Sequence, residues 1–247
     1  SHTDSTSLLA KLTSTMASID YIHDPEPISN LLTIEVDTST SGRVILHRQA
    51  YIESLLSSHR LELDAQPTRP PLTPADDNPT TGLDAYVTEA LAISDTSIHL
   101  SPSDAHSYRK LVNSLDTCAT GARPDIAYAT GMLQRCLSCP TRHLLDAAYR
   151  VLRYLRTDTA LGIHYTLSAA PLAGMSDSDW STGRSTTGWT FLYGNAAISW
   201  MSAEQPSIAL STCEAEIMAA SSASDEAIRI DDRLRAFGRK SIGPVSL

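Results

Sequence analysis

Cysteine, positive charge and long apolar runs are all scarce in this 247-residue sequence. Its four cysteines are too few for a disulfide framework in a chain of this length, so we expect free thiols in a reducing compartment. No apolar run reaches the roughly 18 residues of a transmembrane helix, and the polar stretch Ser1–Ser7 does not resemble a secretory signal. These absences predict an intracellular protein without a membrane span, in a compartment that the sequence does not specify.

The shortage of positive charge argues against a surface built as a whole to bind nucleic acid. The chain holds 19 Lys and Arg against 28 Asp and Glu, a formal net charge of -9. Proteins that bind nucleic acid with their whole surface are usually basic. Only residues 104–166 reverse the balance, with eight basic and five acidic side chains. Any nucleic-acid interface is therefore expected in this middle segment.

The composition still supports a folded protein of one large or two small domains. Hydrophobic residues make up 42% and charged residues 19%, which excludes a disordered chain or a fibre. The pattern along the sequence divides it into four regions. These are a small α/β region at 1–64, a Pro-rich linker or insertion at 65–102, a helical region at 103–167 and a strand-and-helix region at 168–247.

The first region reads as a hairpin followed by a helix. Leu31–Val36 and Arg43–Leu46 are predicted strands with a turn at Ser41-Gly42, and residues 49–56 have helical spacing. The next region contains five prolines in thirteen positions. Because proline lacks the backbone donor and restricts the residue before it, this part predicts an extended loop.

Three helices are predicted in the third region. Ser103 is a candidate N-cap for the first, which runs to about Ala119 and ends at Gly121. Pro124 and Pro140 are typical of helix starts, where the missing N–H costs nothing. The second helix is expected to end near Leu137, and the third carries a leucine-rich apolar face.

The fourth region changes to strands and closes with one long helix. Strands are predicted at 161–165 and 172–177, and a hairpin turns at Gly194-Asn195. Ser211 and Glu214 fit a capping box at the start of the helix. Its predicted buried stripe consists of Glu216, Ala220, Ala223, Ala227, Ile230, Leu234 and Phe237. The fold class predicted overall is α/β, of the α+β kind.

One carboxylate, Glu216, stands at the head of that predicted apolar stripe. A buried carboxylate costs several kcal/mol unless it is paired or binds a metal ion. Asp177, on a predicted strand, is a candidate partner, because a strand Asp facing a helix Glu is a typical Mg²⁺ arrangement. The alternative is that Glu216 reaches solvent in the first helical turn, where the helix dipole favours an acidic side chain.

Several motifs of the chain resemble the copia-type retrotransposon Pol polyprotein. They follow one another in the family's order and cover most of residues 28–237. The motifs are Tyr108–Leu115, Ala119–Tyr128, Ala148–Leu155, Ser176–Trp180, Arg184–Gly188, Ala197–Trp200 and Ala209–Glu216. The resemblance implies the palm end of a reverse transcriptase, a helical thumb/connection region and an incomplete ribonuclease H-like domain with a mixed sheet and one long helix.

The resemblance also implies roles for individual residues. Asp177 and Glu216 match the first and second catalytic acids of ribonuclease H, which bind Mg²⁺ or Mn²⁺ and act on an RNA–DNA hybrid. Asp179 is a further candidate metal ligand, although it and Glu214 match motif positions that are more often structural. Basic side chains of the helical region are candidates to face a template–primer backbone, the alternative being a solvated helix face. They are Arg109, Lys110, Arg150, Arg153 and Arg156.

The sequence departs from the family in three ways. The only Asp-Asp pairs, Asp76-Asp77 and Asp231-Asp232, do not fit the polymerase site, so polymerisation is excluded. The third ribonuclease H acid would follow Pro244–Leu247, which reads as the start of a strand and ends the sequence. The loop Ser181–Gly183 is shorter than is usual in the family.

These departures favour a domesticated, truncated Pol fragment that is catalytically inactive. It would then serve as a structural or interaction subunit, with a protein partner or larger complex covering the truncated sheet edge. One alternative is an active ribonuclease H whose missing ligand comes from a second chain or from Asp179. A second alternative is a nucleic-acid binding module without catalysis.

Overall fold

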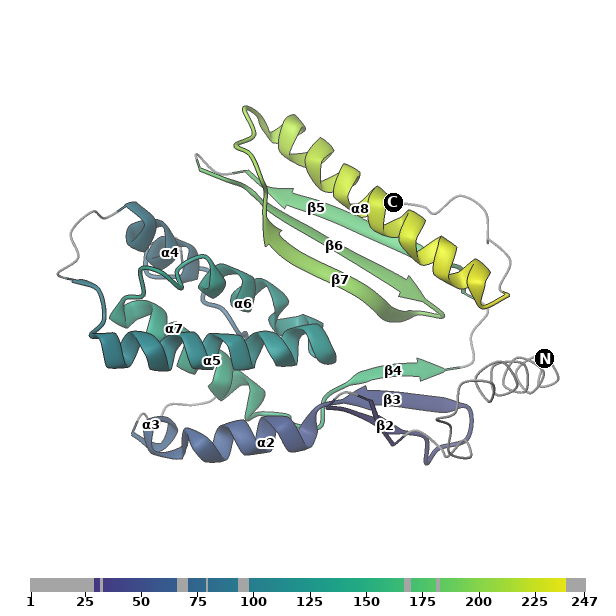
Figure 1. Ribbon diagram of the computed structural model, residues 1–247, viewed down its shortest axis with the longest axis horizontal. Helices are drawn as coiled ribbons and strands as arrows, with labels where there is room; N and C mark the ends of the chain where they lie inside the picture. Colours follow the sequence, from purple (N-terminus) through teal and green to yellow (C-terminus); the bar gives the residue numbers. More distant parts are fainter. Residues whose placement is uncertain are drawn as a thin grey trace, which may run out of the picture.

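The computed structural model describes residues 29–31, 33–65, 71–78, 80–92, 98–166, 170–180 and 183–238. The polar start, part of the Pro-rich segment, the first two residues of the short loop at 181–183 and the strand predicted at the end of the sequence lie outside them. Two antiparallel sheets and two layers of helices make up the described fold (Figure 1), which confirms the α+β class. Within these residues, no helix is long and apolar enough to cross a membrane.

The first sheet has the order β1-β2-β3-β4 and contains the predicted hairpin. Its strands are β1 (Asn30–Leu31), β2 (Ile34–Asp37), β3 (Arg43–His47) and β4 (Ile163–Thr166). The strand predicted at 31–36 is interrupted at Thr33, whose φ of 74° breaks the extended backbone. Gly42 has a φ of 76° and supplies the turn before β3. The fourth strand comes from more than a hundred residues further along the chain.

The helical region holds the larger of the two apolar cores. It consists of α4 (Leu83–Ala92), α5 (Pro102–Gly121), a 3₁₀ turn at Pro124–Ile126, α6 (Ala127–Gln134) and α7 (Arg142–Leu155), with α2 (Gln49–Ser58) and α3 (Arg60–Asp64) alongside. The three predicted helices of this region are confirmed. Their caps differ in detail, because Ser101 rather than Ser103 caps α5, and Thr141, after Pro140, caps α7.

The helix α4 lies within the segment interpreted as a linker or insertion. Its residues Leu83, Val87 and Ala90 are buried in the same core as α5, α6 and α7. Their spacing of four and three residues forms a stripe too short to stand out among the polar neighbours. Asn78 shapes the turn before this helix, since its Oδ1 accepts the backbone N–H groups of Thr80 and Thr81 at 3.0 and 3.1 Å.

The glycine at the end of α5 has a packing role. A Cβ at Gly121 would stand 1.8 Å from the Arg48 Nε, so only glycine allows the guanidinium to lie there. Arg48 itself is buried against the end of the helix and lies over the Tyr51 ring. A cation beside a helix C-terminus is favoured by the partial negative charge of the last carbonyl groups.

The second sheet has the order β5-β6-β7 and carries α8 on one face. Its strands are β5 (Ala173–Asp179), β6 (Thr186–Tyr193) and β7 (Ala196–Glu204), and α8 spans Thr212–Ala236. The predicted hairpin is confirmed, with positive φ at both Gly194 and Asn195. Phe191 centres a small core with Ala223 and Ile230 of α8.

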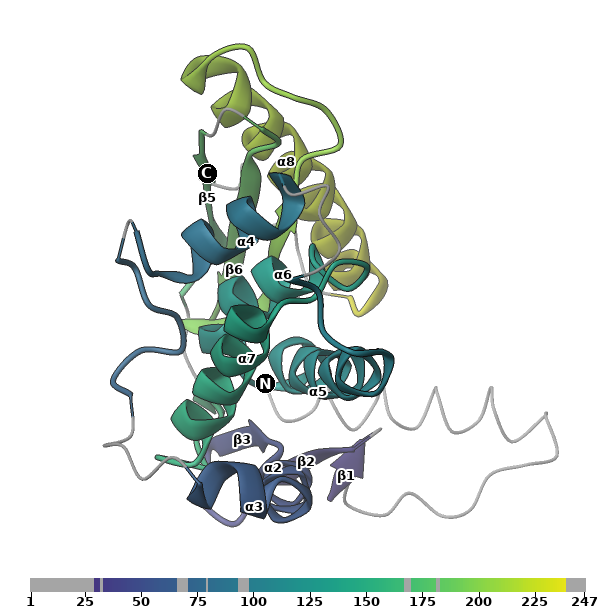
Figure 2. The ribbon, with the colours of Figure 1, turned by 90° about the vertical axis from the view of Figure 1, so that its left-hand side faces the viewer.

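The opposite face of this sheet packs against the helical region (Figures 1 and 2). The Trp200 indole N–H donates to the carbonyl of Ala119 at 2.9 Å, and Arg135 lies 2.6 Å from Glu204. The Tyr165 hydroxyl of β4 donates to the carbonyl of Ala197 at 2.6 Å and links the two sheets. The helices therefore lie between the first sheet and the second sheet.

Candidate functional site

The predicted acids of β5 lie on the sheet face that points away from α8. The indole N–H of Trp189 donates to the Ser222 hydroxyl of α8 at 3.2 Å, and Ser176 is the cross-strand partner of Trp189. Ser176 therefore faces α8. Because side chains alternate along a strand, Asp177 and its neighbour Asp179 two residues on face the other way. Both carboxylates are exposed.

The two aspartates make different local contacts. Asp177 Oδ1 accepts the backbone N–H of Ser178 at 2.9 Å. Asp179 accepts the backbone N–H of Thr186, which ties the end of β5 to the start of β6. The Tyr128 hydroxyl nearby donates to Asp84 at 2.6 Å, and burial, the Asp84 contact and the charge of Asp179 all raise the pKa of Tyr128. Asp179 thus has a structural role at the end of the sheet, beside α6.

Glu216 is not buried, and the predicted stripe of α8 is offset by one residue at its start. At its other end the prediction also fails, because Phe237 follows the helix and is 61% exposed. The buried positions are Ala215, Ala219, Ala223, Glu226, Ala227 and Ile230, whereas Glu216 is exposed. The prediction that Glu216 heads a buried stripe is therefore wrong. The physical reason is that Ala215 and Ala219 are small enough to let the first turns of α8 approach the sheet. The alternative that Glu216 reaches solvent agrees with the structure, although the acidic side chain of the first turn is Glu214.

The predicted metal ligands do not form a metal site in the part of the chain that the structure describes. There, no group of three or more His, Cys, Asp or Glu side chains is close enough to hold an ion. Mg²⁺ prefers six oxygen ligands, and a two-metal site needs several carboxylates in one place. Asp177 and Glu216, on a strand face turned away from α8 and on the exposed side of α8, do not fit this requirement.

The carboxylate that α8 does bury is Glu226, which the sequence analysis missed. Its oxygens accept the Ser199 hydroxyl and the Arg229 Nε–H, both at 2.8 Å, and Arg233 lies 3.7 Å away. Burial by itself raises the pKa of Glu226, but the hydrogen bonds from Arg229 and Ser199 outweigh it, so the pKa lies below its usual value. The sequence did contain a signal for this buried carboxylate, because Arg229 and Arg233 follow Glu226 by three and seven residues and so lie on the same side of the helix.

Glu214 belongs to the start of α8. The Ser211 hydroxyl accepts the Glu214 backbone N–H at 3.2 Å, and a Glu214 carboxylate oxygen accepts the Leu210 backbone N–H at 2.8 Å. The predicted capping box is thereby confirmed, with the return bond reaching the residue before the cap. Glu214 satisfies backbone donors and takes no part in a cluster with Asp177.

Most of the five candidate nucleic-acid-binding residues have protein partners. Arg109 donates to the carbonyl of Leu137 at 3.2 Å, Arg150 lies 3.9 Å from Asp76, and Arg156 lies 3.7 Å from Asp64. Arg153 is half-buried. Lys110 is exposed beside His59, whose pKa is lowered by burial and further by the Lys110 charge. Of these, Arg150 and Arg156 lie near a carboxylate, both at long distances, so the five side chains do not form one uniform row of free cations along a helix face.

The fold and the acidic strand define an α+β protein in which a helical region joins a hairpin sheet to a strand–helix unit. Comparison with known proteins extends this description. The chain is 30% identical over 237 residues to the retrovirus-related Pol polyprotein from transposon TNT 1-94 of Nicotiana tabacum, which covers 94% of the chain and 17% of the polyprotein. It is 31% identical over 220 residues to the uncharacterized mitochondrial protein AtMg00810 of Arabidopsis thaliana, covering 87% of the chain and 83% of that protein.

A further relative matches a shorter part of the chain. The secreted RxLR effector protein 161 of Plasmopara viticola is 40% identical over 118 residues, which are 46% of the chain and 83% of the effector. No protein-family model matches the sequence, and no solved structure matches it. The chain belongs to the family of copia-type retrotransposon Pol polyproteins, of which it spans a minor part of the full length.

Proposed function

We propose that this Pol-derived chain has no catalytic turnover and acts as a structural or interaction subunit of a larger assembly. The observation that carries the proposal is the position of its two predicted catalytic acids. Glu216 lies exposed on α8, and Asp177 lies on the sheet face turned away from that helix. Because the described residues bring no third ligand to either acid, no step of the proposed function uses Mg²⁺ or Mn²⁺.

An interaction role is supported by the surface around the start of α8. Trp180, Ile208, Leu210 and Ile217 are 49% to 86% exposed. The indole N–H of Trp180, which follows β5, donates to the carbonyl of Ala209 in the loop between β7 and α8. We call these four residues the apolar tip. Among the described residues, β5 pairs only with β6, so its other edge keeps unpaired backbone groups beside the tip. Exposed apolar groups next to a strand edge favour association with another chain.

An active ribonuclease H is the second candidate function. The observation in its favour is that Asp177 and Asp179 are both exposed on one face of β5, as a strand pair facing a substrate would be. This candidate needs further ligands for its metal ion from another chain. The candidate of a nucleic-acid binding module is less well supported, because Arg109 and Arg156 already have protein partners.

A cleavage assay separates the two leading candidates. We expect the full chain, with an RNA–DNA hybrid and either Mg²⁺ or Mn²⁺, to cleave no faster than its Asp177→Asn variant. An active ribonuclease H serves as the positive control for substrate and buffer. Metal-dependent cleavage of the RNA strand that Asp177→Asn abolishes and Glu204→Gln leaves intact would contradict the proposal, because Glu204 lies on the same sheet but pairs with Arg135.

A further inference from the structure

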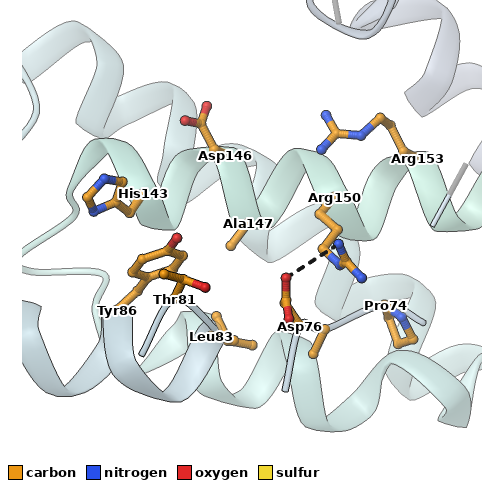
Figure 3. A pocket seen from close by; sticks show the side chains of 11 residues that line it. Pro74, Asp76, Thr81, Leu83, Tyr86, His143, Asp146, Ala147, Arg150 and Arg153 are labelled. Atoms are coloured by element: carbon orange, nitrogen blue, oxygen red, sulfur yellow. Dashed lines mark ion pairs between the residues drawn. The ribbon is translucent and has the colours of Figure 1, made fainter. Parts of the chain in front are cut away.

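A pocket of about 180 Å³ lies outside the acidic strand, between the loop at 71–78, the start of α4 and one face of α7 (Figure 3). Its polar lining includes Asp76 from the loop, Thr81 and Tyr86 from the start of α4, and Asp146, Arg150 and Arg153 from α7. Leu83 and Ala147 supply apolar surface between them. Two arginines therefore border one small pocket from a single helix.

Arg150 is only weakly held by the protein groups around it. Its Nη2 donates to the Thr73 hydroxyl at 3.3 Å, and its Nη1 lies 3.9 Å from the Asp76 Oδ2, too far for a hydrogen bond. The Nε of Arg150 is buried and has no hydrogen-bond partner. Buried N–H groups are almost always paired with an acceptor. The unpaired Nε–H of Arg150 therefore leaves the guanidinium able to bind an oxyanion.

The second arginine strengthens this argument. Arg153 lies one helical turn from Arg150 and lines the same pocket. Burial lowers the pKa of Arg153, and the positive charge of Arg150 lowers it further. Two guanidinium groups that repel each other are stabilised by an anion placed between or beside them. Two carboxylates also line the pocket. Asp76 lies 3.9 Å from Arg150, and Asp146, whose charge raises the pKa of Arg153, lies 3.3 Å from Arg142.

The far wall of the pocket offers neutral donors and a flat aromatic surface. The Tyr86 and His143 rings are stacked with their centroids 4.7 Å apart, and Figure 3 shows Thr81 beside them, across from the Arg150 and Asp76 pair. His143 lies 3.9 Å from Glu89 on its outer side. Hydroxyl donors opposite a guanidinium are a common lining for the oxygens of a phosphate group.

We propose that this pocket binds the terminal phosphate of a phosphate monoester through Arg150, with Arg153 adding positive charge. A monoester carries a charge of about -1.5 to -2 near pH 7, whereas a carboxylate carries one, so the monoester competes better with Asp76. The volume suits a phosphate and a few further atoms, since pockets that enclose drug-sized ligands measure roughly 300–1,000 Å³. The ligand is either a free phosphate ester or the 5′-phosphate of a nucleic-acid strand.

The test is calorimetric titration of the full chain at constant ionic strength with inorganic phosphate as the probe. The wild type shows saturable binding. Arg150→Gln weakens it at least tenfold, whereas Arg156→Gln, which breaks a similar ion pair at the end of the same helix and outside the pocket, changes it less than twofold. Asp76→Asn tightens binding several-fold, because it removes the competing carboxylate. Circular dichroism checks that each variant is folded.

Two results would overturn the proposal. The first is the absence of saturable binding by the wild type, and the second is an equal loss in Arg150→Gln and Arg156→Gln. If Arg150→Gln does not fold, Asp76→Asn decides: tighter binding supports the site, and unchanged or weaker binding overturns it. Oligodeoxynucleotides with and without a 5′-phosphate then identify the source. Preference for the phosphorylated strand over inorganic phosphate supports a strand end, and equal binding supports a free ester.

Discussion

Glu226 and Glu216 stand ten residues apart on α8 and have opposite environments. The side chain of Glu226 is 10% exposed and holds Ser199 of β7 together with two arginines of its own helix. Glu216 is exposed and is the fifth residue of the helix. A carboxylate that keeps its charge while buried must be compensated by donors, and Arg229, Arg233 and Ser199 supply that compensation.

Replacing Glu226 by Gln is expected to lower the free energy of unfolding by about 1–3 kcal/mol at pH 7, because the hydrogen bonds it accepts from Arg229 and Ser199 lose their charged acceptor. The pKa of Glu226 in the folded chain lies below its usual value of 4.5. Its contribution is therefore present in full above pH 4.5 and is lost as the pH falls through the folded-state pKa. Urea denaturation at pH 7 and at pH 3.5 measures the difference.

The matched control is Glu216→Gln, which changes the same functional group on the exposed side of the same helix. It is expected to shift the free energy of unfolding by less than about 0.5 kcal/mol at either pH. Equal effects of the two substitutions, or an effect of Glu226→Gln that does not shrink in acid, would show that the buried ion pairs do not stabilise α8.

At the scale of elements, the start of α8 is stabilised by the Ser211 and Glu214 side chains, which form the capping box that the sequence predicts. Ser211 accepts the backbone N–H of Glu214, and Glu214 accepts that of Leu210. Gln205 adds a tertiary contact, since its side-chain amide donates to the Thr187 hydroxyl and to the carbonyl of Ala215. The helix therefore begins where both its own cap and the edge of the sheet specify it.

Substitution Ser211→Ala is expected to lower the free energy of unfolding by about 1 kcal/mol, because one N-terminal N–H group of α8 loses its acceptor. Thermal unfolding followed by circular dichroism measures the change. Ser221→Ala, at an exposed interior position of the same helix, is the control and is expected to be neutral or slightly stabilising. A loss as large at Ser221 as at Ser211 would contradict the capping role.

At the scale of the whole molecule, the helical region and the second sheet form one continuous packing unit. Trp200 and Glu204 of β7 contact α5 and α6, and a Cβ at Gly131 of α6 would stand 2.8 Å from the carbonyl oxygen of Ser202. This close approach places one sheet face against helices, whereas no other described strand pairs with the outer edge of β5 and the apolar tip is exposed. Association with a partner is therefore expected at that end of the molecule.

The substitution Leu210→Asp is expected to release the chain from the proposed assembly. In extracts of cells that produce the protein, size-exclusion chromatography should show the wild type above its own mass of 26.7 kDa and Leu210→Asp near that mass. A charge at the tip opposes burial of this surface in an interface. Leu72→Asp is the control, since Leu72 is also 86% exposed but lies in the loop before α4. A wild type that elutes alone, or equal release by both variants, contradicts the interaction role.

Most of the secondary structure could be predicted from the sequence, because helix caps, tight turns and apolar periodicity are local signals. The hairpin turn at Gly194-Asn195, the capping box at Ser211 and the leucine-rich face of α7 each depend on neighbouring residues, and the structure confirms all three. The short sequence motifs likewise predicted the family of the chain, and the comparisons with known proteins confirm that family. The short helix α4 was missed because three apolar residues in a polar segment give a weak periodic signal.

Tertiary structure alone decided which side chains meet. The pairing of β3 with β4 joins residues far apart in the sequence, and Arg48 is buried only because α5 ends in a glycine. The candidate acids depended on the same information: a shift of one residue in the buried face of α8 exposes Glu216 and leaves Glu226 as the carboxylate within the core. Helical spacing predicts the buried face of a helix only to within about one residue. Which side chains are buried is then decided by how the helix packs on the sheet.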